Sequence, residues 1–376
     1  MPIPWTPPAI EPQEQAALED PTHQAPTALR ELDGVEVEGL YILEAFHVLG
    51  EGDGVNGNLD LIANFNLETL LGLRGLVGSV YFLATHGDGV TDDVGDFQIN
   101  SNIEAPEATR LYELWLDQTW AASGTSVRAG IFDLTSEFDV IPSGQLFIHS
   151  SPGTGAEFAA SGLTGPSTFP VSSLATRLEL QPTERSYLRL AVGDGVPGDP
   201  DDPQSNQVRL SSEEGAVFVG EAGFVGPNRK LAVGAWGYTT EFERPGGETS
   251  TGSAGLYAFA DQPLLDDGVE GGRGLNAFLR VGFADDRNTT LDRYVGGGLV
   301  QRAPLPGRTS DALGLGVFAA RFSDGGDWET AIELTYQAAL TDWFMLQPDL
   351  QVVVDPSGRS DLDDAVLIGL RASIAF

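Results

Sequence analysis

Side chains suited to binding polyhydroxylated molecules recur on one face of the alternating segments of this chain. A guanidinium group or a carboxylate pairs with neighbouring hydroxyls through hydrogen bonds, and a flat aromatic ring stacks on the C–H face of a pyranose. Trp115 shares its sequence parity with Glu113 and Asp117, so we expect it to be the stacking aromatic, with Trp236 as a weaker candidate. The alternative is that the polar residues of this face are only solvated, in internal salt bridges. The polar candidates are Glu113, Asp117, Arg128, Arg177, Glu179, Arg189, Arg280, Glu333, Asp349, Gln351 and Arg371.

Strands are the elements that must position these side chains. From residue 35 onward, segments of roughly ten residues alternate apolar and polar side chains between clusters of Gly, Asp, Pro and Asn, which is the period-2 pattern of β-strands. Residues 58–67 (NLDLIANFNL), 330–340 (TAIELTYQAAL) and 366–376 (VLIGLRASIAF) are clear examples. We count about sixteen such segments, an even number that suits a closed antiparallel barrel.

Alternation alone does not separate a soluble sandwich from a membrane barrel, because both have one apolar face. Three features favour the barrel: the segments are uniformly long, the chain ends in an apolar strand with a terminal aromatic, Phe376, and glycines occupy the polar face at Gly296, Gly298, Gly314 and Gly316. Residues 35–376 are therefore predicted to be all-β, a 16-stranded antiparallel transmembrane β-barrel. Residues 1–34 hold seven of the 23 prolines and are predicted to be an arm with a short helical piece around residues 29–32.

Composition excludes several classes of protein. The 376 residues contain 20 Lys+Arg and 55 Asp+Glu, for a formal net charge of −35, and Lys230 is the one lysine. Such a chain repels phosphates, so a nucleic-acid partner is not expected. The absence of cysteine excludes disulfides, thiolate metal sites and a Cys nucleophile, and no apolar run reaches the 18 residues of a transmembrane helix.

We expect neither an enzyme nor a cofactor. The spacing Gly193-x-Gly195-x-x-Gly198 fits the dinucleotide fingerprint, but the DPDDP run that follows it cannot open a helix. No nucleophile elbow, Walker lysine or H-E-x-x-H motif is present, and the four histidines are isolated in the sequence. Calcium in the acidic loops 88–96 and 194–202 stays possible, although a solvated acidic loop is the simpler interpretation.

Nine runs of the sequence carry a resemblance to a known family: RLYELWLDQ (110–118), VRAGIFD (127–133), Glu137-Phe138, FIHSS (147–151), GPSTFP (165–170), YLRLAVGDG (187–195), Asp261-Gln262, LQPDLQ (346–351) and LIGLRASIAF (367–376). In their order and spacing, these runs together resemble the carbohydrate-selective porin family, OprB-like. The resemblance covers about residues 29–376 and implies a 16-stranded outer-membrane barrel whose long loop after the fifth strand folds inward as a constriction loop, here roughly residues 134–172. Ile131 departs from the family, which usually has a basic residue before the Phe-Asp step.

The resemblance implies passive diffusion of mono- or oligosaccharides through a constricted pore, with carbohydrate solutes and outer-membrane lipid as partners. The net charge of −35 leaves a general cation-selective porin as an alternative. A secreted β-rich carbohydrate-binding protein or glycoside hydrolase is a third possibility. The sequence leaves the choice between monomer and homotrimer open.

Overall fold

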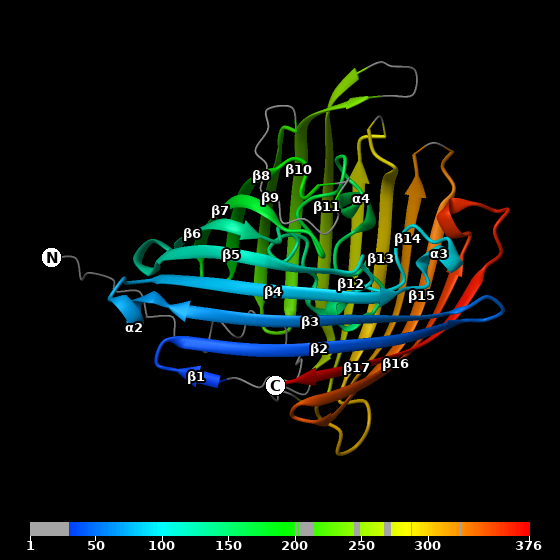
Figure 1. The fold of residues 1–376 in the computed structure, drawn as a ribbon, viewed down its shortest axis with the longest axis horizontal. Helices are drawn as coiled ribbons and strands as arrows, with labels where there is room; N and C mark the ends of the chain where they lie inside the picture. Colours follow the sequence, from blue (N-terminus) through cyan, green and yellow to red (C-terminus); the bar gives the residue numbers. More distant parts are fainter. Residues whose placement is uncertain are drawn as a thin grey trace.

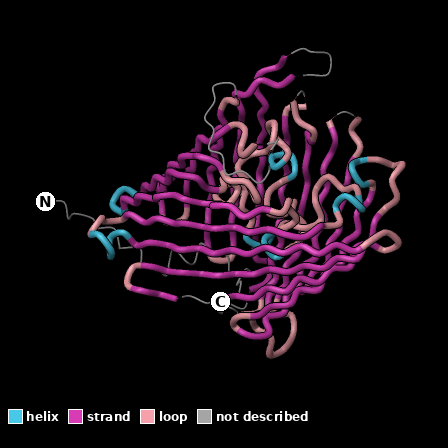
Figure 2. Tube along the Cα trace, viewed as in Figure 1, coloured by secondary structure: helices cyan, strands magenta, loops and turns pink. Residues whose placement is uncertain are grey.

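The alternating segments form long antiparallel strands that make up most of the molecule (Figures 1 and 2). The computed structural model describes residues 30–199, 202, 214–243, 249–266, 272–286, 288–323 and 325–376. The sixteen strands of the wall are β2 (Val35–Val48), β3 (Asp53–Asn66), β4 (Leu76–Asp88), β5 (Ala108–Trp120), β6 (Thr125–Phe132), β7 (Ser173–Thr183), β8 (Ser186–Asp194), β9 (Ala216–Gly226), β10 (Arg229–Glu243), β11 (Thr249–Asp266), β12 (Gly274–Ala284), β13 (Leu291–Arg302), β14 (Ala312–Phe322), β15 (Trp328–Thr341), β16 (Phe344–Val354) and β17 (Ala365–Ala375).

The sheet closes on itself. Each wall strand pairs antiparallel with the next strand along the chain, and β17 pairs with β2, where Ile374 lies opposite Tyr41. Just beyond this register, the backbone groups of Gly39 and Phe376 hydrogen-bond to each other. Closure leaves no open edge along the wall, so the backbone groups of every strand have partners on both sides. The predicted closed 16-stranded antiparallel barrel is confirmed.

A short strand, and not a helix, begins the described chain. Around residues 29–32 the sequence predicted a helical piece; its described part is β1 (Arg30–Leu32), in which Arg30 lies opposite Val37 of β2. β17 reaches β2 only from Leu40 onward, and β1 supplies hydrogen-bond partners to the part of β2 that β17 leaves uncovered. Residues 1–29 of the predicted arm lie outside the described residues, so the boundary at residue 34 stays a prediction.

The two ends of the barrel differ in the length of their connections. One end, called here the short-turn end, has tight links such as residues 121–124, and it contains the chain's C-terminus. The opposite, long-loop end bears residues 89–107 and 133–172. No helix of the described chain is both long and apolar enough to span a membrane. The helices within the described ranges are the short segments α2 (Leu67–Leu71), α3 (Thr91–Val94), η2 (Ala121–Ser123), η3 (Pro142–Leu146), α4 (Ala156–Ala159) and η4 (Pro356–Gly358).

The apolar face of the wall points outward. On β15, Leu334 is 44% exposed on the outer surface, whereas its neighbour Glu333 is fully buried inside. Outward leucines, valines and phenylalanines continue around the barrel. A soluble sandwich would bury this face in its core, so the exposure favours the barrel interpretation and supports the predicted parity.

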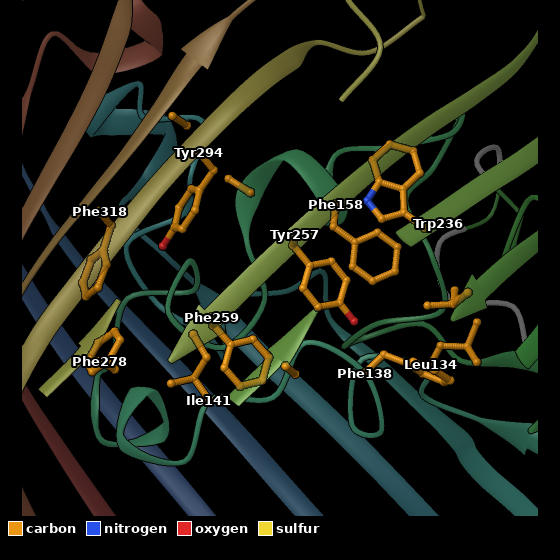
Figure 3. Packing of buried hydrophobic residues seen from close by; sticks show 14 of the residues in the cluster. Leu134, Phe138, Ile141, Phe158, Trp236, Tyr257, Phe259, Phe278, Tyr294 and Phe318 are labelled. Atoms are coloured by element: carbon orange, nitrogen blue, oxygen red, sulfur yellow. The ribbon is translucent and has the colours of Figure 1, made fainter. Parts of the chain in front are cut away.

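The largest hydrophobic core lies inside the barrel. The loop of residues 133–172, called here the large inward loop, packs its apolar side chains mainly against the inner faces of β9 to β14 (Figure 3), and the cluster extends to Ala175 of β7, Ala191 of β8 and Ala331 of β15. Phe138 and Phe158 of the loop are fully buried, and Phe158 lies beside Trp236 and Tyr257 of the wall. Full burial of a side chain of this size stabilises the folded protein by about 1.5–3 kcal/mol. This packing confirms the predicted inward loop.

Candidate functional site

Arg280 anchors the large inward loop to β12. Its guanidinium donates to Asp139 at 2.6–3.0 Å and to Glu157 at 2.8–2.9 Å, and both carboxylates belong to the loop. All three side chains are essentially inaccessible. A fork that is bonded to two carboxylates in this way is geometrically fixed, so Arg280 positions the loop and has no accessible surface for a passing solute.

Carboxylates of the wall hold the backbone of the same loop. Glu333 accepts hydrogen bonds from the amides of Ile148 at 2.7 Å and His149 at 3.1 Å. Asp261 likewise accepts from the amide and hydroxyl of Ser143, at 2.7 and 2.9 Å. These bonds satisfy backbone donors that would otherwise be buried without partners.

Small residues of the wall make room for the loop. Gly314 and Gly316 point inward on β14, and a Cβ atom on either would lie within about 3.1 Å of the ring of Phe147. That ring packs edge to face against Phe278 and Phe318, with centroids 5.7 and 5.4 Å apart. The glycines predicted on the inner face therefore lie there, and the structure shows that these two create space for Phe147.

Residues 89–107, called here the second inward loop, also fold into the barrel, which the sequence analysis did not anticipate. Glu329 of β15 accepts hydrogen bonds from the amides of Phe97 and Gln98 at 2.7 and 2.8 Å. Gln351 donates to the carbonyl of Asn100 at 2.9 Å, and Arg371 bonds both Glu44 and Asn102. The two inward loops also contact each other, because Asn102 donates to the carbonyl of Phe147.

Seven of the predicted site residues come together on the other side of the barrel, on β5 to β8. Three arginines alternate there with three carboxylates, and we call this set the arginine–carboxylate ladder: Asp117, Arg128, Glu137, Arg177, Glu179 and Arg189. Arg128 bonds Asp117 at 3.2 Å and Glu137 at 2.7 Å, and Arg177 bonds the same two carboxylates at 2.8 and 3.0 Å. Arg189 bonds Glu179 and also the carbonyl of Glu137.

Glu137 belongs to the large inward loop and lies at the centre of the ladder. Burial alone raises the pKa of this carboxyl, but the charges of Arg128, Arg177 and Arg189 outweigh it and lower the pKa to about 2. Glu137 is therefore ionised at neutral pH. It joins the base of the loop to the ladder side of the wall.

The accessible part of this site is formed by Arg128, Arg189, Glu113 and Trp115. The side chains of Arg128 and Arg189 are 18% and 22% exposed, whereas that of Arg177 is only 5% exposed. The guanidinium carbon of Arg128 lies 3.7 Å from the ring centroid of Trp115, a cation–π geometry. Glu113 accepts from the indole of Trp115 at 2.8 Å and from the amide of Asp133 at 3.0 Å.

The other five predicted site residues contact the inward loops or each other. Arg280 and Glu333 bind the large inward loop, and Gln351 and Arg371 bind the second. Asp349 accepts a hydrogen bond from Gln351 at 3.0 Å. Trp236, the weaker aromatic candidate, stacks on Phe158 with 5.6 Å between the ring centroids. The sequence correctly predicted that these five residues and Trp236 point inward, but the two inward loops cover them.

Sequence reasoning did not select Glu137 or Glu329 as functional residues. Glu137 is in a loop, where parity carries no information, and Glu329 is one inward acid among many. The family resemblance included Glu137-Phe138 only as a matching pair of residues. An acid that recurs near the start of the inward loop in related sequences is the signal that would identify Glu137.

The described residues include no group of three or more His, Asp or Glu side chains arranged to hold a metal ion. The acidic loop 88–96 falls within this description, and it contains α3 and the buried side chain of Asp96. The acidic loop 194–202 lies partly outside the described residues. Calcium therefore gains no support from the geometry of the described acidic loop.

Residues 51–376 match the carbohydrate-selective porin, OprB family. The chain belongs to this family. It is 22% identical over 371 residues to Porin B of Pseudomonas aeruginosa, a match that covers 83% of this chain and 80% of that protein. The porin family and the barrel identify a transport channel for carbohydrates.

Solved porin structures share the fold. The high-pH structure of Pseudomonas putida OprB superposes with a TM-score of 0.81 at 19% identity, over 92% of this chain and 94% of that one. The low-pH structure of the same protein gives a TM-score of 0.61 at 17% identity, over 92% and 93% of the two chains. At these identities the similarity establishes the fold of the OprB barrel, while the details of the pore come from this chain's own residues.

Proposed function

We propose that this OprB-family chain spans the outer membrane and that sugars diffuse through it passively, past the arginine–carboxylate ladder. The observation that carries this proposal is the partial exposure of Arg128 and Arg189 on a wall whose charges are already paired. Glu113 and Trp115 lie beside them and add an acceptor and an aromatic edge. Such a surface offers donors and acceptors for hydroxyls at one level of the channel.

Paired charges suit a neutral solute better than a charged one. In the ladder each guanidinium already has a carboxylate partner. A neutral sugar therefore replaces bound water with its own hydroxyls and leaves the balance of charge in the site unchanged. The resulting binding is weak, which a channel needs because a tightly held solute leaves slowly. No residue in this scheme forms a covalent bond or requires an energy source.

Two fixed loops support selection by size. The large inward loop is packed against β9 to β14, and the second inward loop is bonded to β2, β15, β16 and β17. Together they take up space on one side of the barrel and leave the ladder on the other. We propose that solutes pass along this remaining side.

Planar-bilayer conductance of the purified protein tests the proposal. Glucose and a series of maltooligosaccharides are added while the single-channel current is recorded. Saturable block by sugar is expected, and its dependence on chain length measures the size of the site. Stable current steps that are indifferent to every sugar would contradict selection at the ladder and leave the barrel intact.

A general cation-selective pore is the second candidate, favoured by the excess of carboxylates. The sequence has 55 acidic and 20 basic residues, and Asp60 and Asp133 are further buried acids inside the barrel, where they accept hydrogen bonds from Tyr81 and Tyr112. The reversal potential in a KCl gradient distinguishes the two candidates. Strong cation selectivity without sugar block would favour the general pore.

A further inference from the structure

A row of aromatic and basic side chains crosses the outer face of β12 to β15 near the long-loop end. The strand registers place Phe283 opposite Arg293, Arg293 opposite Arg321, and Arg321 opposite Trp328. All four residues have the outward parity of their strands, and the outer surface exposes 48% of Phe283 and 38% of Trp328. We call these four residues the outer arginine row.

One buried acid, Asp292, pairs closely with Arg321 and more loosely with Arg293. Asp292 is 5% exposed and accepts two hydrogen bonds from Arg321, the one from Nε at 2.8 Å. The Nε atom of Arg293 lies 4.0 Å from the same carboxylate, and the side chain of Arg293 is 50% exposed. Arg293 and Arg321 thus share the carboxylate of Asp292, and the charge of Asp286 also acts on Arg321.

Apart from Thr330 of β15, apolar and small side chains follow the row toward the middle of the wall. Val295 and Ala319 lie opposite each other in the next outward layer, and Gly297 and Val317 in the layer after that. Leu279 of β12 and Ile332 of β15 flank them on the outer surface. The largely apolar surface below the row therefore suits hydrocarbon chains.

The row contrasts with the rest of the same end. Among the described strand residues, Arg293 and Arg321 are the arginines that point outward near the long-loop end. The loops there are rich in acids, including Asp286 and Asp327 beside the row. Free anions approaching through water meet these acids first, whereas a lipid in the adjacent leaflet reaches the arginines from the side.

We propose that the outer arginine row binds a phosphate group of lipid A, the phosphorylated glycolipid of the outer leaflet. This inference rests on the proposed placement of the barrel in the outer membrane, with the long-loop end on the extracellular side, where barrels of this kind have their longer loops. Arg293 and Arg321 supply charge-assisted donors to the phosphate. Phe283 and Trp328 lie at the level where aromatic rings favour the membrane interface, and the apolar strip below them contacts the acyl chains.

The test compares lipid binding by wild-type protein and two double variants. R293Q/R321Q removes the row's charges, and R74Q/R185Q removes two exposed charges from the short-turn end as a matched control. Native mass spectrometry in detergent measures binding of bisphosphorylated lipid A, monophosphorylated lipid A and phosphatidylglycerol. Loss of two charged hydrogen-bond donors is expected to weaken bisphosphorylated lipid A binding by about tenfold or more in R293Q/R321Q, with no change in the control.

Three outcomes would overturn the inference: wild-type affinity for lipid A in R293Q/R321Q, an equal loss in the control variant, or an equal dependence of phosphatidylglycerol binding on the row. The last result would mean that the row recognises any lipid phosphate. Folding is checked by heat-modifiable gel migration, and sugar-blocked conductance of R293Q/R321Q is expected to equal that of the wild type. Normal conductance without lipid A binding would refute the lipid site alone, whereas a protein that does not enter bilayers would refute the proposed function.

Discussion

Inward-pointing residues of the wall have different roles on the two sides of the barrel interior. Along β9 to β14 the wall presents aromatic rings and glycines, and the large inward loop fills the space against them. Along β5 to β8 the wall presents charged side chains that pair with each other and remain partly exposed. We call these the packed side and the ladder side.

The comparison shows that an inward charge on its own does not indicate a solute site. Arg280 and Arg128 both point inward from strands, yet Arg280 is 1% exposed beneath the loop and Arg128 is 18% exposed beside the channel. Their exposure differs because the large inward loop covers Arg280 and leaves Arg128 partly uncovered. Glu137 connects the two sides because its backbone belongs to the large inward loop and its carboxylate pairs with Arg128 and Arg177 of the ladder.

The largest effect is expected from removing the charge that holds the loop on the packed side. Arg280→Met leaves Asp139 and Glu157 buried without their cation, which costs about 3–5 kcal/mol of stability. Chemical unfolding in lipid vesicles measures the loss, and release of the loop is expected to raise single-channel conductance. Arg74→Met, at a 93% exposed position, is the control. An unchanged conductance and stability would show that the loop does not depend on this anchor.

A smaller effect is expected from filling the space that Gly314 provides. In Gly314→Val the new side chain meets Leu146 and Phe147, because a Cβ atom there already lies 3.0 Å from each of them. Overpacking of this kind costs about 1–3 kcal/mol. Ala319→Val, on the outer face of the same strand, is the matched control and is expected to be nearly neutral. Equal unfolding midpoints of the two variants would argue against tight packing on the packed side.

The ladder side is expected to respond to acid through Glu137. Its pKa is lowered from 4.5 to about 2, so its ionised form stabilises the folded barrel fully above about pH 4.5, and this contribution is lost as the pH falls toward 2. Unfolding midpoints measured across this range are expected to fall less steeply in Glu137→Gln than in the wild type. Parallel pH profiles would contradict the assigned role of Glu137.

The smallest effect is expected on solute binding itself. Arg128→Gln removes one charged donor from the accessible surface, and a single hydrogen bond contributes about 0.5–1.5 kcal/mol, so sugar block is expected to weaken by about three- to tenfold. Arg293→Gln makes the same replacement on the outer face and is expected to leave sugar block unchanged. If the two variants behave alike, the ladder is not the solute site.

The sequence by itself determined the strands and their faces. A period of two in apolar residues specifies which side chains point the same way, so the inward parity of Glu333 and the outward parity of Leu334 follow from local order alone. The number of such segments and their resemblance to the OprB family then indicated a closed barrel of sixteen strands. Long-range information was not needed for these conclusions.

Only the tertiary structure decided which inward side chains stay accessible. Arg280 bonds Asp139 from 141 residues away, and Glu333 bonds Ile148 from 185 residues away. No local pattern encodes such contacts, because they depend on where a loop lies after the barrel has closed. The second inward loop and the β1 pairing were missed for the same reason. The arginines of the packed side and of the ladder side are alike in sequence pattern, and the inward loop makes one an anchor and leaves the other facing the channel.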